Sequence, residues 1–269
     1  MNIFFLELRN NRKSTIISTA SICIAIILML LFYPSMKNES MKALAGAKLE
    51  GMSPALLEAL GLSHMIDFTV LTNFFGYVLQ FVTLAIMILV TQRAAGLLSK
   101  EEAEGTIEYL SSKPVSRWEI FYQKALAHVA YLLFMMVAFT IVTVAAYLYV
   151  SDYTFGEALK ETVIFFGSIL FVSFIFSAVG ILISALLKGG KGMGGFSTGI
   201  VFGTYIIGIC SAIIDSLDFC IWLSPMDWIK PQKLISEDIL VGEWVVGSIV
   251  IVICTAAAWL SYRRKDLLV

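Results

Sequence analysis

Six long apolar runs dominate this chain and limit what it can fold into. The first extends from Thr15 to Tyr33 without a charged residue, close to the ~20 residues that an α-helix needs to cross a ~30 Å hydrocarbon core. The composition agrees, because 59% of the residues are hydrophobic and 14% are charged, against roughly 45–50% and ~25% in soluble domains. We therefore predict an all-α, polytopic integral membrane protein, a single domain over 1–269 with six transmembrane helices at about 15–33, 68–92, 125–150, 162–187, 196–214 and 244–262.

The basic residues between these runs are unevenly divided, which predicts an orientation. If both termini are cytoplasmic, the inside carries Arg9, Arg12, Lys13, Arg93, Lys100, Lys113, Arg117, Lys124, Lys188, Lys191, Arg263, Arg264 and Lys265. The outside then carries only Lys37, Lys42, Lys48, Lys160, Lys230 and Lys233. Because Lys and Arg are enriched in cytoplasmic loops, we predict that both termini face the cytoplasm. The first run also exceeds the ~7–15 apolar residues of a signal peptide, so we expect it to be retained.

One polar stretch, Leu98 to Lys124, is the only long, highly charged segment between two apolar runs. It contains two Ser-x-x-Glu pairs, Ser99 with Glu102 and Ser116 with Glu119. This is the spacing of a capping box, in which the serine and the glutamate satisfy each other's free backbone N–H groups at a helix start. The stretch therefore predicts two short helices, separated by a break that ends at Pro114 because proline disfavours helical geometry in the residue before it.

The first of these helices, over 99–110, has two different faces. At helical spacing, the acidic face carries Glu101, Glu104 and Glu108, and the opposite face carries Ala103, Ile107 and Leu110. Such a helix between two spans fits a docking surface for another protein. A solvated connector with no partner explains the same pattern equally well, and the residue types alone leave both interpretations open.

Two further loops have distinctive compositions. Lys188 to Gly195 is rich in glycine and lysine but lacks the Walker pattern, since Lys191 is followed by Gly192, so we interpret it as a tight turn. Asp215 to Glu243 contains an apolar run that is too short to cross a bilayer, and its tryptophans suit an interface. We predict that this segment is re-entrant. Ser53-Pro54 predicts the start of a short surface helix.

The assigned spans contain no Asp, Glu, Lys or Arg, which disfavours a transporter driven by an ion gradient. His128, near the start of the third span, is interpreted as an interfacial residue, with a proton-relay role as the alternative. The four cysteines are widely spaced and read as small apolar residues. The chain has no HExxH, GxSxG or nucleotide-binding motif. We therefore predict no catalytic, metal or cofactor site, and expect any energy from ATP to come from another chain.

Three stretches carry a family resemblance: 101–120 (EEAEGTIEYLSSKPVSRWEI), 223–228 (LSPMDW) and 259–266 (WLSYRRKD). The chain resembles the membrane permeases of the type-two ABC (ATP-binding cassette) exporter family. The resemblance implies an amphipathic N-terminal elbow helix on the cytoplasmic surface, a cytoplasmic coupling helix between spans two and three, and a re-entrant region between spans five and six. It further implies two copies of a separate ATPase subunit that binds ATP and Mg, a second permease copy or a related permease, and no nucleic acid.

The resemblance also implies particular docking residues. The coupling helix that contacts the ATPase would comprise Glu101, Ala103, Glu104, Gly105, Ile107, Glu108, Leu110, Pro114 and Arg117, with a second docking turn at Lys188 and Lys191. The expected function is outward transport of a hydrophobic or amphipathic substrate across a bacterial plasma membrane. The alternative is a non-transporting membrane anchor or sensor that docks a cytosolic partner, and an ATPase gene next to that of this chain would favour the permease.

Overall fold

The computed structural model describes residues 3–36, 67–103, 105, 115–187, 193–235 and 241–265. This part of the chain is 89% helix and contains no strand. Six helical segments are long and apolar enough to cross a membrane. They are α1 (Ile3–Leu31) extended by α2 (Tyr33–Met36), α5 (Leu71–Ala95), α8 (Arg117–Val150), α9 (Phe155–Leu186), α10 (Met193–Ile213) and α13 (Val241–Arg264). The prediction of an all-α protein with six apolar helices is confirmed.

Of the helices that begin earlier than their apolar runs, α8 and α9 start at polar caps. At α8, the Ser116 hydroxyl accepts a hydrogen bond from the Glu119 amide at 3.2 Å. At α9, Thr154 and Glu157 form a full capping box, which satisfies two of the free N–H groups of the first turn. A hydropathy run stops at the first charge, whereas the helix continues through it. Charged residues expected in loops therefore lie within regular helix.

The first helix also differs from expectation. α1 continues without interruption from Ile3 to Leu31, and its sequence contains no proline or glycine that would bend it. The Phe4 amide donates to Gln123 Oε1 on α8 at 3.1 Å, and Ile3 is buried against Ile120. The residues expected to form the elbow are therefore continuous with the first apolar helix, and their position on the membrane surface stays a prediction.

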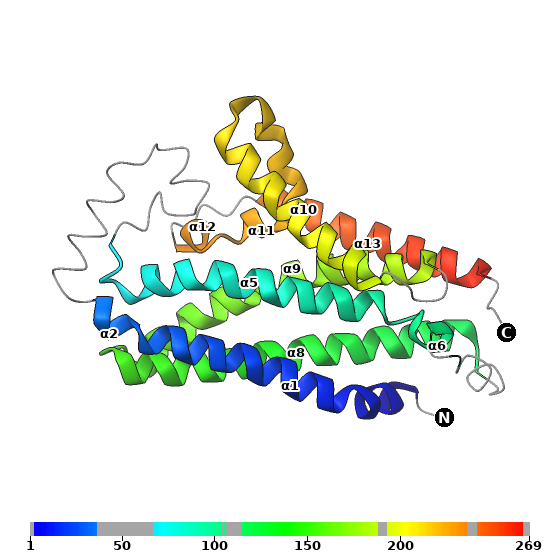
Figure 1. Ribbon diagram of the computed structural model, residues 1–269, viewed down its shortest axis with the longest axis horizontal. Coiled ribbons are helices and arrows are strands. Elements are labelled where there is room, and N and C mark those ends of the chain that lie inside the picture. Colours follow the sequence, from blue (N-terminus) through cyan, green and yellow to red (C-terminus); the bar gives the residue numbers. More distant parts are fainter. Residues whose placement is uncertain are drawn as a thin grey trace.

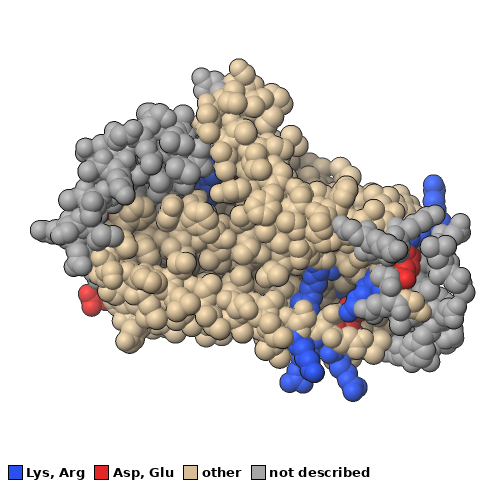
Figure 2. All heavy atoms as spheres, viewed as in Figure 1, with Lys and Arg blue, Asp and Glu red and all other residues tan. Residues whose placement is uncertain are grey.

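The six helices form a bundle with both chain termini at one end (Figure 1). On the face seen in Figure 2, most of the Lys and Arg side chains lie at this end, and the middle of the bundle is uncharged. The predicted orientation, with both termini in the cytoplasm, depends on this concentration of basic residues at the end that holds the termini. The predicted surface helix at Ser53-Pro54 lies outside the described residues.

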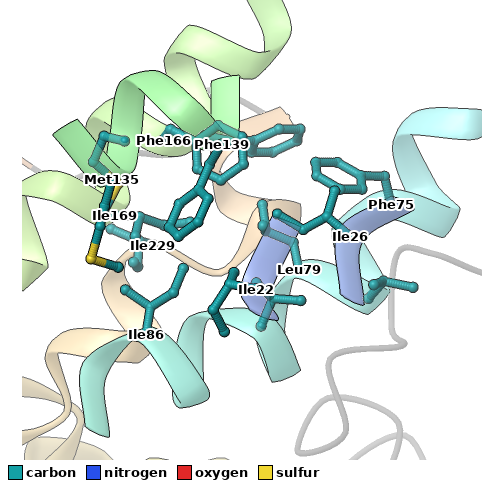
Figure 3. Close-up of a cluster of buried hydrophobic side chains, with 14 of the residues drawn as sticks. Ile22, Ile26, Phe75, Leu79, Ile86, Met135, Phe139, Phe166, Ile169 and Ile229 are labelled. Atoms are coloured by element: carbon teal, nitrogen blue, oxygen red, sulfur yellow. The ribbon is translucent and has the colours of Figure 1, made fainter. Parts of the chain in front are cut away.

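The core runs between α1, α5, α8 and α9 and is built from branched aliphatic and aromatic side chains. Figure 3 shows its middle, where side chains from these helices converge with Ile229 from a later segment. Two glycines permit close helix contacts, as is usual inside membrane proteins. A Cβ at Gly180 on α9 would lie 2.6 Å from Ala94 Cβ on α5, and one at Gly247 on α13 would lie 2.7 Å from Phe171 Cζ on α9.

The segment between the fifth and sixth spans forms no long helix among its described residues. It turns back beside α10 as a 3-10 helix, η1 (Asp215–Leu223), and continues as α11 (Pro225–Trp228) and α12 (Pro231–Ile235). α12 packs against α5, as Figure 1 shows, and α11 packs against α10. Asp227 at the centre of this segment is 3% exposed; its carboxylate accepts from the Ser224 hydroxyl and pairs with Lys230. Buried charges persist only when they are paired in this way, so the segment is a packed part of the fold.

Candidate functional site

The predicted docking residues lie at the end of the bundle that holds both termini (Figure 1). The structure describes the backbone of Glu101 and Ala103, together with Gly105 and Arg117. Outside the described residues lie Glu104, Ile107, Glu108, Leu110, Pro114, Lys188 and Lys191. The site can therefore be built from its base, residues 97–103, and from the helices that hold this base.

The helix predicted over 99–110 is not continuous. α6 comprises Lys100–Ala103, and Gly105 follows with a φ of 67°, in the left-handed region that only glycine adopts at little cost. The Gly105 amide donates to the Glu102 carbonyl oxygen at 3.4 Å, as in a tight helix end. Glycine at this position therefore terminates α6, and its contact with an ATPase stays a prediction.

The capping box predicted at Ser99 is replaced by contacts to α9. The Ser99 and Leu98 amides donate to Ser184 Oγ at 3.2 Å and 2.8 Å, and the Ser99 hydroxyl donates to the Ala95 carbonyl oxygen. Ser184 thus accepts the bond that the capping box assigned to Glu102. Because Ser99 and Ser184 are fully buried, these hydrogen bonds fix the chain direction directly after α5.

A buried lysine from α8 holds the same segment from another side. Lys124 is 2% exposed, and its ammonium donates to the Leu97 carbonyl oxygen at 2.7 Å. Around it, Leu97, Leu98 and Phe121 pack with Ala258 and Tyr262 of α13. Lys124 was expected at the edge of a solvated loop. The structure places it in the third turn of α8, where its ammonium group binds a backbone carbonyl of the same chain.

Lys265 joins the two predicted docking segments at their bases. Its ammonium lies 2.9 Å from Glu102 Oε2 on α6 and 2.8 Å from the Leu187 carbonyl oxygen, one residue before the Lys188 turn. The side chains of Lys265 and Glu102 are 6% and 2% exposed. Met193, just after that turn, places its sulfur 2.8 Å from Ser99 Oγ. We call Lys265, Glu102, Lys124 and Ser184 the anchor network, because together they hold residues 97–103 against α8, α9 and α13.

Arg117, predicted as a docking residue, contacts the C-terminal end of α13. Its Nη1 donates to the carbonyl oxygens of Lys265 at 2.7 Å, Arg263 at 3.1 Å and Tyr262 at 3.4 Å. Carbonyl groups at a helix end have no partner within the helix, and a cation there also complements the helix dipole. Arg117 therefore has an internal structural role, and its contact with an ATPase stays a prediction.

A second polar cluster lies at the opposite end of the bundle. Glu161 accepts hydrogen bonds from the Tyr147 hydroxyl at 2.9 Å and Thr72 Oγ1 at 3.0 Å. Tyr153, in the connection between α8 and α9, is hydrogen-bonded to Thr72 at 2.9 Å, and burial raises the pKa of its hydroxyl above the ordinary value of 10. Glu161, Thr72 and Tyr153, with Tyr33, line a cavity of about 750 Å³. The phenol stays protonated at neutral pH and can donate to a carboxylate.

The helices extend beyond the assigned spans and therefore contain ionisable groups that those spans do not. Glu157 and Glu161 belong to α9, Lys124 to α8, and Arg93 to the last turn of α5. His128 is 4% exposed and lies 2.9 Å from Ser177 Oγ on α9, so it packs inside the bundle, and its interfacial depth in the membrane stays a prediction. Among the described residues, no group of three or more His, Cys, Asp or Glu could hold a metal ion.

The family model described as "ABC-2 family transporter protein" matches residues 1–267, almost the whole chain. The chain belongs to the ABC-2 family of transporter proteins. Members of this membrane family form the transmembrane component of a transporter, and the ATPase is a different subunit. No curated protein matches the chain. The ABC-2 assignment agrees with the six apolar helices and makes this a multi-pass membrane protein.

The anchor network is the part of the site of this ABC-2 protein that could not be predicted from the sequence. Lys265 follows two arginines and was counted only as part of a basic tail, and Lys124 only as part of a loop. A charged residue next to an apolar run usually faces water, so neither position signals burial. The one available signal is that Lys124 falls on the same helical face as Phe121 and His128, three residues before it and four after.

Proposed function

We propose that this chain is the permease subunit of an ABC exporter. Two permease copies, identical or related, would assemble with two copies of a separate ATPase that binds ATP and Mg. The assembly would carry a hydrophobic or amphipathic substrate outward across a bacterial plasma membrane. The family match over residues 1–267 carries this proposal, since ABC-2 membrane proteins work with an ABC ATPase.

The anchor network supports a mechanical role for the central loop. A solvated connector needs no fixed base, whereas the base here is held by a buried ion pair and by buried hydrogen bonds from three helices. Burying charges in this way is costly unless the geometry is good. A base that is fixed to α8, α9 and α13 would pass a displacement of the docking helix on to the membrane helices.

The decisive test combines assembly with transport. The chain would be co-expressed with its cognate ABC ATPase, and the complex would be purified and reconstituted in lipid vesicles. We expect the ATPase to co-purify and an amphipathic fluorescent dye to accumulate in the vesicles only with ATP. The control is the same complex with the catalytic glutamate of the ATPase replaced by glutamine. Stable assembly without ATP-dependent movement of any amphipathic dye would favour the anchor or sensor.

A pair of variants tests the docking helix itself. Ile107→Asp would place a charge in the expected apolar contact, which costs several kcal/mol if the charge stays buried and unpaired. Glu104→Ala removes only one exposed ion pair, worth about 0–1 kcal/mol. With equal protein levels in the membrane, we expect the first variant to lose the ATPase during purification and the second to retain it. Full assembly and full stimulation of hydrolysis by Ile107→Asp would contradict the docking assignment.

A further inference from the structure

A polar cavity of about 170 Å³ lies between α1, α5 and α8, at the end of the bundle that holds the termini. Its lining includes Glu7 and Asn11 from α1, Arg93 from α5, Lys100 from α6 and His128 from α8. The volume is well above the ~10–15 Å³ that a single water requires. It is below the ~300–1,000 Å³ of sites that enclose a whole small molecule. The cavity therefore fits a small polar group rather than a complete transport substrate.

Arg93 presents a fixed and unneutralised positive charge to this cavity. Its Nη2 donates to Thr15 Oγ1 at 2.7 Å and to the Asn11 carbonyl oxygen at 3.1 Å. The guanidinium also lies over the Tyr131 ring, 3.8 Å from the ring centre. In the described part of the chain, no carboxylate lies within ion-pair distance of Arg93. These contacts hold the guanidinium in place, and its remaining N–H groups are left for a bidentate acceptor such as phosphate.

Whereas Arg93 offers hydrogen-bond donors, His128 offers a hydrogen-bond acceptor that has no donor among the described residues. The Ser177 hydroxyl donates its proton to the Ser173 carbonyl oxygen at 2.6 Å, so the 2.9 Å contact between Ser177 and His128 is donated by His128 Nε2. In a neutral imidazole, Nδ1 is then a bare acceptor. His128 is 4% exposed, and no group in the described part of the chain donates to its Nδ1. A buried acceptor of this kind requires a donor from a ligand or from water.

We propose that this cavity binds the headgroup of an anionic, hydroxyl-bearing phospholipid. The phosphate lies on Arg93 and Lys100, and a headgroup hydroxyl donates toward His128 Nδ1. The two cations and the single carboxylate of Glu7 leave the lining with one net positive charge, which matches one phosphodiester. A choline headgroup offers no donor, and an ethanolamine headgroup cancels the charge of its own phosphate.

The position of the cavity in the fold suits a lipid. Arg9, Arg12 and Lys13 are exposed on α1 at the same level, and Figure 2 shows Lys and Arg gathered over this part of the molecule. Just beyond it, α1 exposes apolar side chains such as Ile16 and Ile17, which suit contact with acyl chains. Basic pockets between transmembrane helices at such a level bind anionic lipid headgroups.

Gly96 allows the cavity to be filled without removing any polar group. It lines the cavity and has a φ of −82°. A Cβ added there would meet only the backbone oxygens of Arg93 at 3.6 Å and Gln92 at 3.8 Å, which are ordinary contacts. Gly96→Ala is therefore tolerated, whereas Gly96→Leu extends into the space assigned to the headgroup.

The test measures lipid retention by the purified full chain. Phosphatidylglycerol, phosphatidylethanolamine and phosphatidylcholine are supplied separately in detergent, and native mass spectrometry counts the lipids that remain bound. We expect stoichiometric retention of phosphatidylglycerol and much less of the other two. Arg93→Gln and Gly96→Leu should each lower that retention about tenfold, the loss expected when one charge-assisted contact is removed.

The matched controls are Gly96→Ala and Arg12→Gln, which removes an exposed arginine at the same level of α1; both should retain phosphatidylglycerol like the unchanged protein. Equal retention by Gly96→Leu overturns the proposal, even if Arg93→Gln fails to fold. So does an equal loss in Arg12→Gln, which would indicate a diffuse surface charge. Displacement of the lipid by an equal concentration of inorganic phosphate would show a site for free phosphate and also overturn it.

Discussion

Replacing Lys265 with methionine gives the sharpest test of the anchor network. Lys265 contacts Glu102 Oε2 at 2.9 Å and the Leu187 carbonyl oxygen at 2.8 Å. Methionine fills a similar volume but has no charge and no N–H donor. Lys265→Met therefore removes both contacts while the Glu102 carboxylate keeps its buried position. We expect the base of the central loop, residues 97–103, to open more readily in this variant.

The size of the effect follows from the burial of the pair. The two side chains are 6% and 2% exposed, so solvent screening does little to weaken their interaction. Removing one partner of a buried ion pair costs ~3–5 kcal/mol, mostly because the other charge stays buried. If this cost falls on the local opening of residues 97–103, the protection of their amides from exchange should fall about 100- to 4,000-fold.

Hydrogen exchange resolves the prediction to a segment. The amides of Leu98 and Ser99, which donate to Ser184 Oγ, report the closed base directly. Glu102→Gln combined with Lys265→Met removes the buried charge and should restore most of the protection. It should not restore all of it, because the Leu187 carbonyl oxygen still lacks its donor. Arg264→Met is the matched control, since Arg264 is exposed and adjacent in sequence.

Equal rates of amide exchange over residues 97–103 in Lys265→Met and Arg264→Met would contradict this prediction. So would lower protection in the double variant than in Lys265→Met alone. Either result would mean that the ion pair does not hold the base, and that apolar packing around Phe121 and Tyr262 suffices.

Two further substitutions test specific backbone positions. Gly208→Ala would place a methyl group onto the Asp227 carboxylate, and such overpacking costs about 1–3 kcal/mol. Thermal unfolding in detergent should show this loss of stability. The control is Gly203→Ala, whose added Cβ would meet no neighbouring atom within 4 Å, and which should be neutral or slightly stabilising. At Gly105, with φ 67°, alanine should cost about 1–2 kcal/mol through strain alone, and asparagine less. Protection of the α6 amides measures this cost, and an alanine variant as protected as the native chain would contradict a left-handed Gly105.

The number and order of the transmembrane helices could be predicted from the sequence, because hydropathy over ~20 residues is set by the bilayer and needs no knowledge of neighbours. The helix ends could not be predicted equally well. The apolar criterion started the fourth span at 162, one residue after Glu161, whereas the capping box at Thr154 starts α9 at Phe155. The Thr-x-x-Glu pair is visible in the sequence and would have corrected this boundary.

The buried charges were out of reach for a different reason. Glu102 and Lys265 lie far apart in the chain, and each is surrounded by other charged residues. Local pattern predicts a solvated face in both places, and only the packing of α13 against α9 brings the two side chains together. Long-range pairs of this kind have no local signature, which is why the docking face was predicted but its base was not.

The helix predicted over 99–110 shows how a periodic pattern can exceed its helix. The acidic and apolar faces repeat at helical spacing through Leu110, yet Gly105 interrupts the helix after one turn. An isolated helix of this length is marginal in water, and glycine costs ~1 kcal/mol more than alanine inside it. Periodicity therefore indicated which residues would share a face of a helix. It did not indicate where the helix ends, and Gly105 in the middle of the pattern was the sign of that end.

The anchor network also indicates which helix connects the two polar ends of the bundle. Residues 97–103 are bonded to α9 through Ser184, and the other end of α9 carries Glu161 in the wall of the 750 Å³ cavity. Between these points α9 is in close contact with α5 at Gly180 and with α13 at Gly247. Packed helices shift as rigid bodies rather than deforming continuously. We therefore expect a displacement that keeps the anchor network intact to carry α9, and with α9 the wall of the cavity at the far end.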